Sequence, residues 1–429
     1  MKTLATLALA AALFVAGGLG LTGQPGPAAP VVGSAFGRPP AGDVDLANHV
    51  DQLQRRLAAV PADHVSWASL GLAYVEQARV TADPSYYPKA EGALARSLEL
   101  DTTENFPAYA GRAALASGRH DFAAARDLAR RGLDINPASA TLLGALGDAE
   151  IQLGNYPAAF DAIQRMVDVA PGTASLTRAS YAWELRGEVG EATALMRRAL
   201  DDAVTAADRA FARYYLGELA FHAGDPTGAL AEYEAGLAAD PSQARLLEGR
   251  AKARAALGQT EAALSDYATV VARLPEPAYL IQYGELLESA GRVDEAQQQY
   301  RLFATVARLF EDNGVRPDVD QTLFAADHGD PAAALRYGEA GIATRQFVDM
   351  ADAYAWALHV NGRDTDALAW SDKALELGTR NALFHFHAGM IRAALGDSGG
   401  ARARLTQALE INPHFSPIWA PVARQSLGL

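Results

Sequence analysis

The residues Gly396–Gly400 read Gly-Asp-Ser-Gly-Gly, the signature that surrounds the nucleophilic serine of chymotrypsin-class proteases. That chemistry needs a histidine base and an orienting aspartate on a scaffold of β-strands. The chain has no alternating apolar pattern of the kind that predicts strands, and it contains no cysteine. We therefore expect Ser398 to lie in a turn between two helices, and we predict that the protein has no catalytic residues.

The nine histidines are the next candidates, because imidazole is a common ligand of zinc. Two histidines on one helix bind zinc together when they stand four residues apart, as in the HExxH pattern. His385 and His387 are only two residues apart and would point to different faces of a helix. We predict no metal site and no cofactor, and we interpret these histidines as core or groove residues.

The sequence also lacks a P-loop, an EF-hand loop and the glycine pattern of dinucleotide-binding folds. With no coherent group of catalytic side chains, we predict that the protein is not an enzyme. One alternative stays open at this point. The chain would then be an accessory or assembly factor for an envelope enzyme or transporter, handling a metal through its histidines.

Composition narrows the classes of function further. The chain holds 37 Lys and Arg against 51 Asp and Glu, so its formal net charge is −14. Proteins that bind nucleic acids need basic faces that displace counterions from phosphate, and this balance excludes them as a class. Half of the residues are apolar, and Ala and Leu dominate, which favours a well-packed helical protein.

The first residues are typical of an export segment. Met1 and Lys2 form a short positive start, and the stretch from Leu4 to Leu21 is uncharged and mostly apolar. We predict a signal peptide or a signal anchor over residues 1–22, followed by a linker rich in Pro and Gly over residues 23–42. The protein is then extracellular or attached to the cell envelope, and touches a membrane only through a possible N-terminal anchor.

Alanine recurs through the rest of the chain at steps of 33 to 38 residues. A glycine stands five residues before each of the last eight of these alanines. The phased alanines are Ala90, Ala125, Ala159, Ala192, Ala229, Ala263, Ala296, Ala334, Ala367 and Ala401. The phased glycines are Gly154, Gly187, Gly224, Gly258, Gly291, Gly329, Gly362 and Gly396. Two residue types at one fixed offset indicate an internal repeat.

A helix–turn–helix unit explains both positions. Glycine ends the first helix because it adopts a positive φ without steric cost, and alanine lets the two helices cross closely. Apolar residues between these positions follow helical spacing, as in Ile163, Met166 and Val167. A proline twelve residues after several of the alanines closes the second helix, at Pro137, Pro171, Pro241, Pro275 and Pro413.

This pattern resembles the tetratricopeptide repeat, a helical unit of about 34 residues. Its first half, Trp-x2-Leu-Gly-x2-Tyr, is present as Trp67, Leu70, Gly71 and Tyr74. Two further copies contain Leu146, Gly147, Tyr156, Ala159 and Pro171, and Leu216, Gly217, Gly224, Ala229, Tyr233 and Pro241. The resemblance implies an all-α, right-handed solenoid of about ten units over residues 63–413. We expect residues 43–62 and 414–429 to form capping helices, because end units otherwise expose an apolar face.

The resemblance also implies a non-catalytic scaffold that binds a protein or peptide partner at the cell envelope or outside the cell. First helices of such repeats line a concave groove, and the matching positions here include aromatic residues. The groove positions are Phe211, Tyr214, Glu218, Phe221, His222, Asp352, Trp356, His359, Phe386 and Met390. The alternative is that these aromatic residues pack against neighbouring helices. The clamp for a C-terminal carboxylate found in some relatives is not reproduced, because Glu248 stands between Arg245 and Lys252.

Overall fold

The computed structural model describes residues 43–316 and 319–429, and in these residues it contains 22 helices and no strand. The predicted export segment, residues 1–22, and the predicted linker, residues 23–42, lie outside the described residues. Among the helices described, none combines the length and the apolar character needed to cross a membrane.

Ten antiparallel helix pairs follow one another after a first single helix, α2 (Asp43–Ala59). The first five pairs are α3 (His64–Thr81) with α4 (Tyr86–Leu100), α5 (Phe106–Gly118) with α6 (Phe122–Ile135), α7 (Ala140–Gln152) with α8 (Tyr156–Val169), α9 (Thr173–Glu184) with α10 (Val189–Asp201), and α11 (Ala206–His222) with α12 (Pro226–Ala239). The next five are α13 (Ala244–Ala256) with α14 (Thr260–Arg273), α15 (Pro277–Ser289) with α16 (Val293–Asp312), α17 (Val319–Asp327) with α18 (Pro331–Ile342), α19 (Val348–Val360) with α20 (Asp364–Ala374), and α21 (Ala382–Ala394) with α22 (Ser398–Ile411). The chain closes with α23 (Trp419–Leu427).

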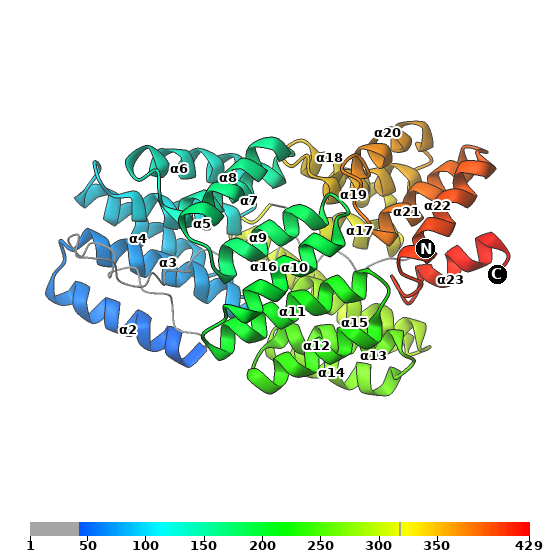
Figure 1. Ribbon diagram of the computed structural model, residues 1–429, viewed down its shortest axis with the longest axis horizontal. Helices are drawn as coiled ribbons and strands as arrows, with labels where there is room; N and C mark the ends of the chain where they lie inside the picture. Colours follow the sequence, from blue (N-terminus) through cyan, green and yellow to red (C-terminus); the bar gives the residue numbers. More distant parts are fainter. Residues whose placement is uncertain (1–42, 317–318) are drawn as a thin grey trace. The chain divides into compact units, whose positions relative to one another are not determined.

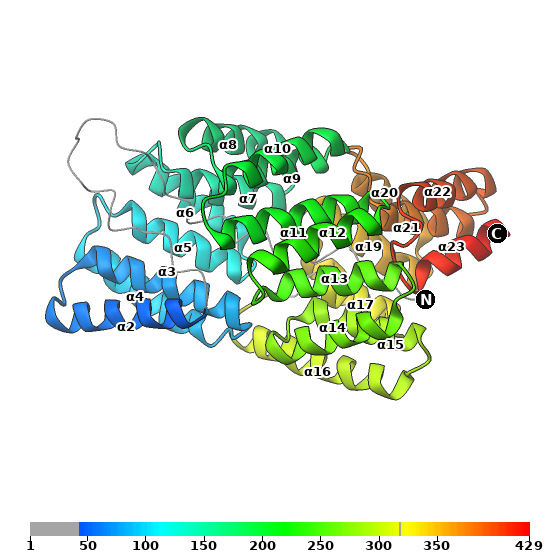
Figure 2. The ribbon, with the colours of Figure 1, turned by 60° about the horizontal axis from the view of Figure 1, so that its bottom comes forward.

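Successive pairs stack on one another, as α11–α14 do in both views of the ribbon (Figure 1, Figure 2). The described chain forms two compact units. The N-terminal unit comprises the described residues up to Ala179 together with Leu309–Arg316, and the C-terminal unit comprises Ser180–Arg308 and the described residues from Val319 onward. The fold is thus an all-α helical solenoid, as the sequence predicts.

The repeated positions do what the sequence analysis expects of them. All eight phased glycines have positive φ, from 73° at Gly362 to 89° at Gly329. Every phased alanine is buried, and Ala159 and Ala229 have no exposed surface at all. In the α5–α6 turn, His120 stands where eight of the other pairs have glycine, and it too has a positive φ of 57°. This strained position is rare for a residue with a side chain.

Two helices cover the ends of the array. α2 packs on α3 through an apolar stripe of Leu46, Val50, Leu53 and Leu57. At the other end, α23 packs on α22, and Trp419 is almost fully buried. These helices place apolar side chains where an uncapped repeat would expose its core.

Candidate functional site

Within the C-terminal unit, segments far apart in sequence meet along a line that we call the seam. It joins the turns at Gly187 and Gly224 to the segments around Gly378 and Ile411–Pro413. The buried side-chain amide of Asn412 donates a hydrogen bond of 2.9 Å to the carbonyl oxygen of Phe221, which lies 191 residues earlier. The joined helix pairs are five pairs apart along the chain, so the C-terminal unit closes on itself.

Glycine makes this closure possible. A Cβ atom at Gly224 would lie 2.8 Å from the carbonyl oxygen of Ile411, and one at Gly187 would collide with the carbonyl oxygen of Gly378. Both residues also have positive φ, which disfavours any side chain. These two glycines therefore serve a turn and a close backbone approach at once, whereas Gly258 and Gly362 serve only a turn, with open space around them.

A pocket lies in the seam, and we call it the seam pocket. Its walls come from α9, α11, α19 and α21 and from the segments before α21 and after α22. Tyr181, Glu184, His222 and Asn381 are partly exposed at its walls, and Arg380 is exposed. The remaining lining is mostly apolar and buried, with Leu185, Leu219, Phe221, Val348, Phe384 and Phe415. A few polar groups over an apolar floor are typical of a ligand site.

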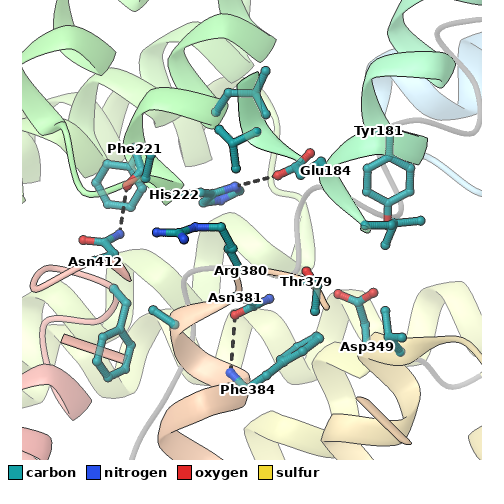
Figure 3. A pocket seen from close by; sticks show the side chains of 17 residues that line it. Tyr181, Glu184, Phe221, His222, Asp349, Thr379, Arg380, Asn381, Phe384 and Asn412 are labelled. Carbon is teal, nitrogen blue, oxygen red and sulfur yellow. Dashed lines mark hydrogen bonds and ion pairs between the residues drawn. The ribbon is translucent and has the colours of Figure 1, made fainter. Parts of the chain in front are cut away.

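Arg380 occupies a central place in the seam pocket. Figure 3 shows its side chain reaching toward His222 and Asn412, with Tyr181 and Phe221 on opposite sides of it. In the part of the chain that the structure describes, no hydrogen bond or ion pair holds its guanidinium group. Burial, followed by repulsion from Arg404 and Arg380, lowers the pKa of the nearby His385 to about 4. His385 is therefore uncharged near neutral pH and does not compete with Arg380 for an anion.

A row of buried charged side chains continues from the seam pocket into the unit. Glu184 lies 3.2 Å from Nδ1 of His222, whose Nε2 lies 3.8 Å from Glu218. The Nζ atom of Lys252 lies 2.8 Å from Glu218 and 3.3 Å from Glu248. Two carboxyl groups thus share one ammonium group. Burial raises the pKa of Glu248 to about 7, although Lys252 opposes the shift.

Comparisons with known proteins agree with this repeated architecture. A family model described as tetratricopeptide repeat matches residues 110–174, 176–244 and 249–307. The chain contains tetratricopeptide repeats over these residues. A search of curated protein sequences finds no match.

Several solved structures are similar to this chain. One is a tetratricopeptide repeat protein from Parabacteroides merdae, 20% identical, with 60% of this chain and 97% of that chain covered and a TM-score of 0.35. Yeast Tom70 is 14% identical, with 90% and 96% covered and a TM-score of 0.36. The human IFIT1 dimer with PPP-AAAA is 13% identical, with 86% and 87% covered and a TM-score of 0.45.

The predicted groove residues of this chain lie at several places in the C-terminal unit, and most of them are buried. Phe221 and His222 line the seam pocket, while Glu218 sits behind them in the row of buried charges. The buried members are Tyr214, Glu218, Phe221, Asp352, Trp356 and Phe386, and the partly exposed ones are Phe211, His222, His359 and Met390. A role in binding stays a prediction for these residues, and the seam pocket brings together only two of them.

Trp356 and Phe386 pack against neighbouring helices, which is the alternative to a role in an open groove. The indole Nε1 of Trp356 donates a hydrogen bond of 2.8 Å to Asp327, and its ring stacks on His387 at 4.2 Å between centroids. Trp419 of α23 contacts both Trp356 and Phe386. The end of the chain folds over these two rings and removes them from water.

The C-terminal segment also covers first helices elsewhere in the unit. Across a second pocket, His414, Pro417 and Arg424 face Lys252 of α13 and Gln282 of α15. The repeat pattern does not predict that the C-terminal segment covers these helices, and it does not indicate Arg380 and Asn412 as site residues. Arg380 and Asn412 lie in loops between helices, and the repeat pattern carries no information on which distant turn such a loop meets.

The other chemical candidates have structural roles. Asp397 caps α22 by accepting a hydrogen bond of 2.9 Å from the backbone N–H of Gly400, and Ser398 is the exposed first residue of that helix. The predicted turn between two helices is present, and Ser398 follows it directly. His387 is buried and shares a hydrogen bond of 2.8 Å with Asp352. Within the described residues, no three His, Asp or Glu side chains are grouped as metal ligands.

Proposed function

We propose that this protein is a non-catalytic scaffold at the cell envelope or outside the cell, and that the seam pocket receives a segment of its protein partner. The observation that carries the proposal is an unpaired, exposed Arg380 in a pocket whose lining combines apolar side chains with several polar ones. The apolar N-terminal stretch of the sequence supports export. The family supports binding, since its repeats are interaction modules.

Site-specific photo-crosslinking in intact cells tests the binding part. A photoreactive amino acid replaces Ala223, which lines the seam pocket and is exposed, or Ala403, an exposed residue of α22 outside the pocket. We expect a discrete cross-linked partner from position 223 that is absent from position 403. Loss of that product in Arg380→Glu would link it to the pocket. Equal products from both positions would reject the seam pocket as the site.

Cell fractionation tests the location. The full chain is expected outside the cytoplasm, and a chain that starts after residue 22 is expected to stay inside. Cytoplasmic full-length protein would reject export while leaving the binding proposal intact.

A further inference from the structure

We infer that the partner segment places an Asp or Glu side chain on Arg380, with an apolar residue on each side of that acid along its chain. The inference rests on the proposed function and names the chemistry that the seam pocket selects. The charged groups that line the pocket decide which ligand group can enter without leaving a buried charge unpaired.

The acidic groups of the pocket are already engaged. The carboxylate of Glu184 lies 3.2 Å from His222, and Asp349 also has an interaction partner. A cationic ligand group would have to compete with these contacts. Arg380, by contrast, has free N–H groups in the described structure and extends between the other lining residues of the pocket (Figure 3).

Two side-chain amides lie beside Arg380 in the pocket lining, and neither of them carries a charge. The side chain of Asn381 accepts hydrogen bonds from the backbone N–H groups of Leu383 and Phe384 and so caps α21. The amide of Asn412 donates to Phe221. Among these neighbours, the guanidinium group is thus the charged donor that remains, and its planar fork matches a carboxylate with two parallel hydrogen bonds.

The apolar walls indicate an internal segment of a chain and not a chain end. Tyr181 lies on one side of Arg380, and Phe221 lies on the other (Figure 3). A segment that continues in both directions from its acid buries an apolar side chain on each side. A terminal carboxylate would leave one wall without a partner. The overall charge of −14 attracts basic partners at long range. The preference for an acidic side chain therefore comes from the contact with Arg380 in the pocket and not from the charge of the whole chain.

Peptide selection against the purified full chain tests the inference. One library displays random peptides within a loop, so that both ends are joined, and a second library presents free C-termini. The baits are the wild-type chain, Arg380→Glu, Arg380→Lys and Arg402→Glu. Arg402 is an exposed arginine of α22 outside the pocket and provides a matched charge reversal.

We expect the loop library to yield an acid flanked by apolar residues on wild type. Arg380→Glu should weaken the selected peptides by about tenfold or more, Arg380→Lys by less, and Arg402→Glu not at all. Selected peptides without an acid, or equal binding to Arg380→Glu, would overturn the inference. Enrichment from the free C-terminal library alone would reject the internal segment.

The two proposals fail in different ways. Acid-free peptides that still cross-link to position 223 would leave the binding function standing and reject only the acid. If neither library yields a binder and position 223 captures no partner, both proposals are wrong.

Discussion

Each of the two units contains a seam between helix pairs that lie five pairs apart, and the two seams are built differently. In the N-terminal unit, the α5–α6 turn meets Arg316. The backbone N–H of Arg316 donates to the carbonyl of Arg119 at 3.2 Å, and its guanidinium group lies 2.7 Å from Asp121. Both side chains of this ion pair are substantially exposed. In the C-terminal unit, the seam is held by a buried amide and by direct approach of backbones.

The difference follows from one repeated position. The C-terminal seam has Gly187 and Gly224 at the phased turn, whereas the N-terminal seam has His120. The ring of His120 stacks on Phe122 and brings its Nδ1 to 3.1 Å from the carbonyl oxygen of Arg316. A side chain at this position adds its own contact beside the backbone hydrogen bond between Arg316 and Arg119. Glycine instead lets the turn itself approach the opposite backbone closely, and the seam that results lines a pocket.

Gly187→Ala should break the C-terminal seam and has the largest expected effect. Alanine at positive φ costs about 1 kcal/mol, and the collision with Gly378 adds about 1–3 kcal/mol. We expect the free energy of unfolding to fall by about 3 kcal/mol, measured by urea denaturation followed by circular dichroism.

Gly362→Ala is the matched control, because Gly362 has the same positive φ and open space around it. It should cost only the conformational term of about 1 kcal/mol. Equal losses in the two variants would show that the turn at Gly187 does not meet Gly378 in solution.

Glu248→Gln tests the buried charges that accompany the close seam. The N-terminal unit buries a balanced pair, Asp148 with Arg178, but the C-terminal unit buries Glu218 and Glu248 with one lysine. The pKa of Glu248 is about 7 when folded, against an ordinary value of 4.5. The folded chain therefore binds this proton more tightly, and the free energy of unfolding falls as pH rises from about 4.5 to about 7.

Glutamine removes this titration. We expect Glu248→Gln to flatten that decline and to be more stable than wild type above about pH 8, by an amount on the order of 2 kcal/mol. Urea unfolding at a series of pH values measures both curves. Identical slopes in the two proteins would mean that Glu248 is charged across the whole range.

The sequence predicts the repeat well because its signal is local. A phased Gly needs a positive φ within its own turn, and a phased Ala needs a close crossing with its own partner helix. Both requirements act over a few residues, so they recur in each unit and are visible as a period. The same reasoning predicts the turn between two helices that Ser398 directly follows.

The seam pocket is not predictable in this way. Whether Gly224 meets Ile411 depends on small rotations between pairs that accumulate over five units. The residue types at Gly224 and Ile411 do not indicate the total rotation between these helix pairs. The same accumulation brings Trp419 onto Trp356 and buries a ring that its position within the repeat would place in an open groove.

Asn412→Ala tests the contribution of one buried hydrogen bond to the C-terminal seam. The variant loses the buried bond to Phe221 and a local bond in which Asn412 accepts from the N–H of His414. Asn136→Ala is its match, because Asn136 also precedes a proline and accepts the same kind of local bond, from Ala138. We expect Asn412→Ala to cost about 1–2 kcal/mol more than Asn136→Ala, since the Phe221 carbonyl stays buried. Equal losses of stability in the two variants would mean that the Asn412 amide does not stabilise the seam.

Arg316→Ala should have the smallest effect, because it removes only the exposed ion pair of the N-terminal seam. Exposed pairs contribute about 0–1 kcal/mol, and the backbone contacts of residue 316 to Arg119 and His120 remain. The small loss should vanish at high salt, since salt screens exposed charges, whereas the loss in Asn412→Ala should persist. A large, salt-independent cost for Arg316→Ala would mean that this seam is as tightly packed as the other. The histidine at position 120 would then not explain how the two seams differ.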